Sequence, residues 1–294
     1  MKIDGVFSGG GIRGIALIGA YEEIERRGFE FIRVAGSSAG AIIAALVAAK
    51  YTSKEIYHLV SELDFAKFLD EGKTMLPFSM TKWIFLYWNL GLYKGNELEK
   101  WMSELLAHKG LKTFADLPPQ TLRVVASDLS TGRLVVLPDD LVHYGIDPKT
   151  FPIAKAIRMS CSLPYFFEPV RLKYHHRTSI IVDGGVLSNF PMWLFDGENI
   201  KRVRPILGIK LSNQLKDRPQ KNIDNAIQLF GALFETMKDA HDARYISRKH
   251  EKDIIFIPLN DVLKTEFTLS NEKKQLLMEK GRECAQKFLS TWSY

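Results

Sequence analysis

The sequence predicts an α/β protein with a mainly parallel sheet, because two strand–loop–helix units occupy its first fifty residues. In the first unit, a short strand over residues 2–8 leads into a glycine-rich loop and an apolar helix, which Gly28 ends. In the second, a strand over residues 29–35 leads through a tight turn into a buried helix over residues 41–49. Strands connected in this way lie side by side and parallel, so both loops are expected at the carboxyl edge of the sheet.

The tight turn, residues 36–40, reads Gly-Ser-Ser-Ala-Gly and matches the pattern G-x-S-x-G. Small residues at Gly36 and Gly40 let the strand and the helix approach each other while the Ser38 hydroxyl projects from the turn. The pattern also occurs in plain tight turns, but the strand–turn–helix context favours a reactive serine. Ser38 is therefore a candidate nucleophile.

The glycine-rich loop, residues 8–14, reads Ser-Gly-Gly-Gly-Ile-Arg-Gly and opens a helix. Such a loop leaves several backbone N–H groups free to bind one anion, either a phosphate or a transient oxyanion. Gly9, Gly11 and Gly14 also satisfy G-x-G-x-x-G, but a dinucleotide-binding fold needs an acidic residue at the end of the second strand. Residues 31–36 contain none, so the loop is interpreted as a neighbour of the nucleophile, and nucleotide binding remains an alternative.

Two aspartates follow predicted strands and could act as the base for Ser38. Asp128 ends a strand over residues 121–128, and Asp183 follows a β-branched strand over residues 178–182 and precedes two glycines. Either carboxylate could instead close a turn by binding a nearby backbone N–H. The residues alone leave both candidates open.

Three motifs in this order resemble the patatin-like phospholipases. They are the glycine loop of residues 8–14, the elbow of residues 36–40, and Asp183-Gly184-Gly185 with Asn189-Phe190-Pro191 downstream. The resemblance extends over residues 2–191, about two thirds of the chain. It implies a three-layer α/β/α fold in a single catalytic domain, residues 1–294, which the C-terminal strands and helices complete.

The same resemblance implies a serine acyl hydrolase that cleaves ester bonds of phospholipids or related lipids through an acyl-enzyme. In this family Ser38 would be the nucleophile and Asp183 the base of a dyad without histidine. The loop would supply an oxyanion hole from Gly9, Gly10 and Gly11, which Arg13 and Gly14 would support. The resemblance implies no metal ion and no organic cofactor.

Composition agrees with a globular enzyme: the chain has 294 residues, of which 46% are hydrophobic and 25% are charged. The formal charge of +6 suits peripheral contact with an anionic membrane, whereas no nucleic-acid partner is expected. Cys161 and Cys284 have no spacing typical of a disulfide framework or a metal site. Because no signal peptide and no apolar run of spanning length is found, a cytoplasmic protein is expected, with peripheral contact with a membrane as an option.

The remaining segments are expected to complete the fold. The aromatic segment of residues 76–93 is expected to pack in the core, with a lid or an interfacial patch as alternatives. The other expected elements are helices over residues 52–69, 96–106 and 152–159, a strand over 133–137 that pairs with 121–128, strands over 205–211 and 253–258, and helices around 223–241 and 276–289.

Two other functions remain open at this stage. An α/β-hydrolase esterase with a Ser-His-Asp triad would need a histidine after the acid, and His241 and His250 have that chain order. Both lie in helical patterns and are interpreted as ordinary histidines, as are His175 and His176 in a basic hairpin. The other alternative is a non-enzymatic module that binds lipid or nucleotide through the glycine loop.

Overall fold

The computed structural model describes residues 1–70, 86–196, 203–212, 223–224, 226–245, 251–259 and 269–293. Its main sheet contains β1 (Lys2–Phe7), β2 (Glu30–Ser37), β4 (Leu122–Asp128), β5 (Arg133–Leu137), β7 (Val170–Tyr174), β8 (Arg177–Asp183), β9 (Ile206–Ser212) and β10 (Ile254–Pro258). The strand order is β10-β9-β1-β2-β4-β8-β7, and β5 also pairs with β4. From β10 to β4 all neighbours are parallel, whereas β5, β7 and β8 pair antiparallel. The prediction of an α/β fold on a mainly parallel sheet is confirmed.

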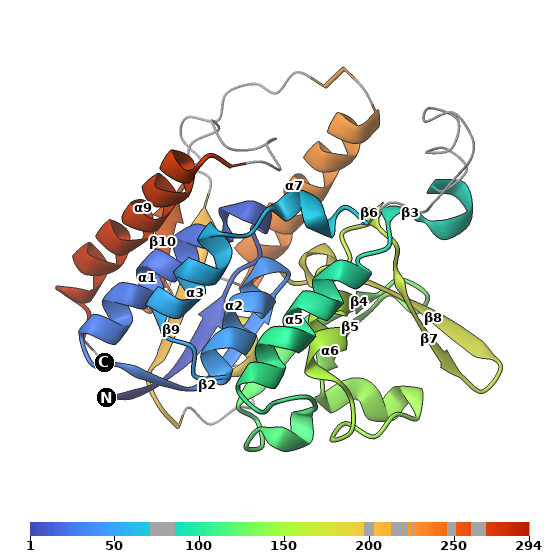
Figure 1. The fold of residues 1–294 in the computed structure, drawn as a ribbon, viewed down its shortest axis with the longest axis horizontal. Coiled ribbons are helices and arrows are strands. Elements are labelled where there is room, and N and C mark those ends of the chain that lie inside the picture. Colours follow the sequence, from blue (N-terminus) through green and yellow to red (C-terminus); the bar gives the residue numbers. More distant parts are fainter. Residues whose placement is uncertain are drawn as a thin grey trace.

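Helices cover both faces of this sheet (Figure 1). They are α1 (Ile15–Arg26), α2 (Ala39–Ala48), α3 (Ser53–Ser61), α5 (Asn96–His108), α6 (Ile153–Ser160), α7 (Ala226–Tyr245) and α9 (Asn271–Leu289). Side chains alternate along β1, so that Ile3 and Phe7 join the core beneath α1, α2 and α9, while Val6 joins a second core on the opposite face. Residues 190–195 and α7 lie on that opposite face. The arrangement is a three-layer α/β/α fold.

Two strands, β2 and β8, meet end to end beside β4. Ser37 at the end of β2 lies opposite Val125 of β4, and Asp183 at the end of β8 lies opposite Ala126. Both must use the same edge of β4, because β5 pairs along the other edge with residues 124–128. The ends of β2 and β8 therefore abut, and β8 reaches the elbow from the direction opposite to that of the parallel strands.

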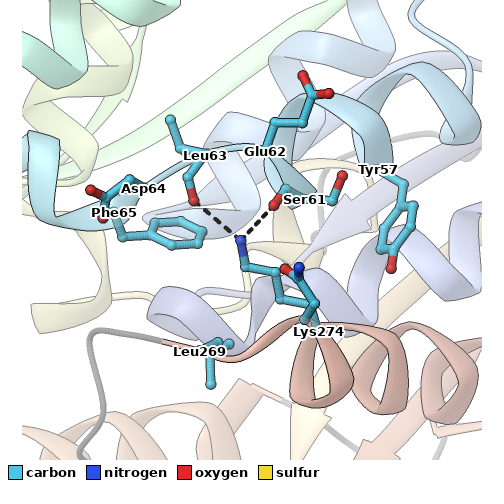
Figure 2. A pocket seen from close by; sticks show the side chains of 9 residues that line it. Tyr57, Ser61, Glu62, Leu63, Asp64, Phe65, Leu269 and Lys274 are labelled. Atoms are coloured by element: carbon cyan, nitrogen blue, oxygen red, sulfur yellow. Dashed lines mark hydrogen bonds between the residues drawn. The ribbon is translucent and has the colours of Figure 1, made fainter.

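The predicted helix over residues 52–69 is wrong in its extent, since α3 ends at Ser61. The Lys274 ammonium of α9 donates hydrogen bonds to the carbonyl oxygens of Ser61 (2.7 Å) and Leu63 (3.2 Å) and lies over the Phe65 ring (Figure 2). A cation is favourable at the C-terminal end of a helix because it binds carbonyls that have no intrahelical partner. After this cap the chain continues into a short 3-10 helix, Phe65–Phe68.

The structure describes only part of the aromatic segment of residues 76–93. Residues 71–85 lie outside the described residues, but Tyr87 and Trp88 are 75% and 72% exposed. The prediction that the segment packs in the core is therefore wrong for these two side chains. Among the described ranges, no helix is both long enough and apolar enough to cross a bilayer.

Candidate active site

Ser38 lies on a sharp turn between β2 and α2 with φ 52° and ψ −126°. Residues other than glycine rarely adopt these backbone dihedrals, so the backbone stores strain here. The flanking glycines make the turn possible. A Cβ on Gly36 would lie 2.3 Å from the Gly40 carbonyl oxygen, and a Cβ on Gly40 would lie 2.2 Å from that of Phe7. The structure therefore has the elbow geometry that projects a serine hydroxyl.

Ser160, the last residue of α6, holds the elbow in place through two hydrogen bonds. The Ser38 backbone N–H donates to Ser160 Oγ (2.9 Å), and Ser160 Oγ donates to the Val125 carbonyl oxygen (2.6 Å). One buried hydroxyl thus connects the nucleophile turn to the centre of the sheet. Sequence reasoning missed Ser160, because a single serine at the end of a helix has no pattern that distinguishes it.

Asp183 is 2% exposed and accepts a hydrogen bond from the Gly185 N–H at 2.7 Å. Burial raises the pKa of its carboxyl to about 6, although the nearby Ser38 hydroxyl, the Gly185 N–H and the positive charge of Lys238 lower it. A carboxylate with this pKa is a better proton acceptor than an exposed aspartate. The structure thus brings Ser38 and Asp183 together.

Glycine at position 184 is needed for this close approach. A Cβ there would lie 2.2 Å from the Val125 carbonyl oxygen and 2.5 Å from Ser37 Oγ. Any side chain at this position would push the end of β8 away from β2 and β4, and Asp183 away from Ser38.

Asp128 has a different environment. Its Oδ1 accepts the Ser130 N–H (2.9 Å), and its Oδ2 accepts the Tyr144 hydroxyl (3.0 Å). In the register of β4 and β8, it lies opposite Ile181, two positions from the level of Asp183. Its carboxylate closes the turn into β5, which is the structural role that the sequence had left open.

The glycine loop lies directly against the elbow. A Cβ on Gly9 would lie 3.2 Å from Ser38 Cβ, and the Gly9 N–H donates to the Asn189 carbonyl oxygen (3.0 Å). The prediction that the Gly9 amide serves as an oxyanion donor is therefore corrected, because this N–H is already bound. By contrast, the N–H groups of Gly10 and Gly11 have no acceptor among the described residues.

Arg13 and Gly14 contact the parts of the site that they were expected to support. Arg13 Nε donates to the Gly10 carbonyl oxygen at 3.4 Å, and its guanidinium lies 4.0 Å from Glu235 of α7. A Cβ on Gly14 would lie 3.1 Å from Ala39 Cβ, so the short 3-10 helix Gly11–Gly14 and the start of α2 are closely packed at this point.

Helix α7 adds charged groups that sequence reasoning missed. Asp242 is buried, pairs with Lys210 of β9 and accepts a hydrogen bond from Asn189 Nδ2 (3.3 Å). Lys238, one turn earlier, lies near Asp183; burial and the positive charges of Arg13 and Lys210 lower its pKa. The residue pattern of α7 indicates only an apolar stripe, and nothing in it shows which charged side chains face the sheet.

Among the described residues, no buried histidine and no metal-ligand cluster is found. The five histidines whose side chains are described are all exposed: His58, His108, His143, His175 and His176. The side chains of His241 and His250 lie outside the described residues. Within the same residues, no three His, Cys, Asp or Glu side chains gather closely enough to hold a metal ion.

Comparisons with known proteins agree with this geometry. The sequence profile of the family described as patatin-like phospholipase matches residues 5–196. The chain is 56% identical to the uncharacterized protein YqhO of Bacillus subtilis over 294 residues, the whole of both chains. It is 25% identical over 188 residues to the probable lipid hydrolase 463L of invertebrate iridescent virus 6, which covers 64% of this chain and 61% of that protein.

A solved structure, that of VipD from Legionella pneumophila, has the same fold. It superposes with a TM-score of 0.59 at 17% identity and covers 99% of this chain and 67% of VipD. Because the family profile spans the glycine loop, the elbow and Asp183, the fold and the site lead to one conclusion. The chain belongs to the patatin-like phospholipase family and is a lipid-hydrolysing enzyme.

Proposed function

We propose that this enzyme cleaves ester bonds of phospholipids or related lipids by a Ser38–Asp183 dyad that forms an acyl-enzyme. The observation that carries the proposal is the meeting of β2 and β8 along one edge of β4, which puts the Ser38 elbow beside a buried carboxyl whose pKa is raised to about 6. A base with a pKa close to the working pH can both accept a proton and return it, which is what the two steps of acyl transfer require.

In the first step, Ser38 Oγ attacks the ester carbonyl carbon while its proton moves to Asp183. The negative charge then forms on the carbonyl oxygen, where the N–H groups of Gly10 and Gly11 can donate hydrogen bonds. The tetrahedral intermediate collapses as the C–O bond to the alcohol breaks, and Asp183 returns the proton to that alcohol. A water molecule, deprotonated by Asp183, then attacks the acyl-enzyme and releases the fatty acid and the free Ser38 hydroxyl.

The site helps this reaction because little must rearrange. Ser38 is fixed by the strained turn and by Ser160, and the loop is fixed through Arg13 and the Gly9 contact with Asn189. Oxyanion donors that are oriented in advance stabilise the transition state by about 3 kcal/mol each, which corresponds to a rate factor in the hundreds.

The test combines covalent labelling with turnover. A fluorophosphonate is expected to add one phosphonyl group at Ser38, located by peptide mass spectrometry, and Ser38→Ala is expected to lose both labelling and hydrolysis of a phospholipid and of a short-chain ester. His241→Ala and His250→Ala should retain both activities. Loss of activity in either histidine variant, with the fold intact, would instead support a triad esterase. An unlabelled Ser38 in folded protein would contradict an enzyme that uses this serine.

A further inference from the structure

A buried ion pair joins β9 to α7 close to the glycine loop. The Lys210 ammonium donates a hydrogen bond to the Asp242 carboxylate, and the two side chains are only 10% and 5% exposed. Taking two charges out of water costs about as much as their attraction returns, so such a pair contributes little net stability. The pair therefore needs a reason other than stability of the fold.

The pair holds the side chain of Asn189, which is 2% exposed. Asp242 Oδ2 accepts a hydrogen bond from Asn189 Nδ2 (3.3 Å), and the Lys210 ammonium lies over the ring of the next residue, Phe190, 5.6 Å from its centre. A carboxylate can only accept hydrogen bonds, so it binds the NH₂ end of the amide and turns the oxygen end away. The ion pair thus fixes which way the Asn189 amide points.

Asn189 in turn contacts both parts of the reacting centre. Its backbone carbonyl oxygen accepts the Gly9 N–H (3.0 Å). Its Oδ1 would lie 2.4 Å from a Cβ on Gly9 and 3.4 Å from a Cβ on Gly185, two residues after Asp183. The amide is therefore packed between the glycine loop and the turn that follows the base.

The end of β9 supports the same loop. Leu211, which follows Lys210, donates its N–H to Ser8 Oγ (3.0 Å). A Cβ on Gly10 would lie 2.2 Å from Leu211 Cδ1, so this part of the loop rests on the leucine side chain. A shift of β9 against α7 would therefore be transmitted to the loop.

We propose that Lys210 and Asp242 are positioning residues for the glycine loop. The pair fixes the Asn189 amide, Asn189 fixes the Gly9 peptide, and the two N–H groups that follow in the loop are thereby kept in place for the oxyanion. The inference rests on the proposed function, because it takes those two N–H groups as the oxyanion donors. Both residues act through Asn189 and not on the substrate.

The experiment measures kcat and KM for p-nitrophenyl butanoate in Lys210→Met/Asp242→Leu, in Asn189→Ala and in the two combined. Replacing both partners of a buried ion pair by apolar residues often preserves stability, so the double variant should keep a urea midpoint close to that of the wild type. Its kcat should fall at least about tenfold with KM changed less than about threefold, because the oxyanion forms only in the transition state. The combined variant should lie within about threefold of either parent, since the pair acts through Asn189.

The matched control is Asp4→Leu/Arg33→Met. This ion pair is also buried, at 0% and 14% exposed, but Asp4 lies near the start of β1, whereas the glycine loop follows its end. The control should keep kcat within about threefold. The pH midpoint of activity should be the same in all variants, because none of them changes the net charge.

Four results would overturn the positioning role while Ser38-dependent hydrolysis by the wild type still supported the proposed function. They are an unchanged kcat in Lys210→Met/Asp242→Leu, an equal loss of kcat in the control, effects that multiply in the combined variant, and a shifted pH midpoint. The last would assign the pair to the electrostatics of Asp183.

Hydrogen–deuterium exchange tests the same inference without reference to activity. The amides of residues 8–14 should exchange at least about tenfold faster in folded Lys210→Met/Asp242→Leu than in the wild type, and at wild-type rates in the control. Faster exchange together with a wild type that has no Ser38-dependent esterase activity would keep the pair as the support of the loop and reject the proposed function. Equal exchange in the folded double variant and the wild type would reject the positioning role.

Discussion

Two aspartates at the ends of paired strands, Asp128 of β4 and Asp183 of β8, have nearly equal burial but different partners. They are 1% and 2% exposed. Asp128 has both oxygens bound, by the Ser130 N–H and the Tyr144 hydroxyl. Asp183 instead lies beside the hydroxyl of a serine held on a strained elbow. Burial at a strand end thus does not decide whether a carboxylate is a base; the groups that lie beside its oxygens do.

The largest expected effect comes from replacing each carboxylate in turn. Asp183→Asn should lower kcat/KM by at least about a thousandfold, because an amide cannot accept the Ser38 proton. Asp128→Asn should change it by less than about threefold. Steady-state hydrolysis of p-nitrophenyl butanoate checks both, with circular dichroism to verify the fold. A loss confined to Asp128→Asn would reverse the assignment of the two residues.

The same two variants should change stability in opposite directions. The pKa of Asp183 in the folded protein lies above its ordinary value of 3.8, so the folded state binds protons more tightly and loses stability as pH rises from about 4 to 6. At pH 8 the ionised carboxyl is therefore a cost, and Asp183→Asn should raise the free energy of unfolding by about 1–3 kcal/mol.

Asp128→Asn should instead lower that free energy by about 1 kcal/mol, since the new NH₂ group cannot accept the Tyr144 hydroxyl. Urea unfolding at pH 8 and at pH 4.5 measures both effects. The gain for Asp183→Asn should shrink to about a third at the lower pH, and a gain that is undiminished there would contradict burial as its cause.

The pH dependence of activity should follow Asp183 alone. Wild-type kcat/KM is expected to fall tenfold per pH unit below about 6, because protonation of Asp183 removes the base. The midpoint should stay in place in Asp128→Asn. A midpoint near pH 4 in the wild type would show that the base is not this buried carboxyl.

The smallest expected effect is a shift of this midpoint by Lys238. Its positive charge favours the ionised form of Asp183, so Lys238→Met should move the acid limb to higher pH, by less than about one pH unit. Lys238→Arg keeps the charge and should keep the midpoint. Equal midpoints in wild type and Lys238→Met would place the lysine outside the electrostatics of the dyad.

Much of the site could be predicted because its parts are local. The elbow at Ser38 and the glycine loop are contiguous motifs, and their backbone geometry follows from where glycine is required. The register of the sheet is not local. Whether Asp128 or Asp183 faces Ser38 depends on β2 and β8 sharing one edge of β4, which no residue pattern specifies.

The remaining errors have the same origin. Gly9 was expected to donate to an oxyanion, but the carbonyl of Asn189, distant in sequence, binds its N–H. Lys238 and Asp242 belong to a helix whose pattern shows which side is apolar but not which charges reach the sheet. Lys274 ends α3 from the other end of the chain, so the end of that helix could not be read from α3 itself.

The most direct test of the Ser38–Asp183 pair is the second-order rate constant for fluorophosphonate addition to Ser38, measured from pH 4.5 to 8.5. In the wild type and in Asp128→Asn it should rise through a midpoint near pH 6 and then level off. In Asp183→Asn it should be at least a hundredfold lower at pH 8 and should lack that midpoint. Wild-type labelling rates and an unchanged midpoint in folded Asp183→Asn would contradict the dyad.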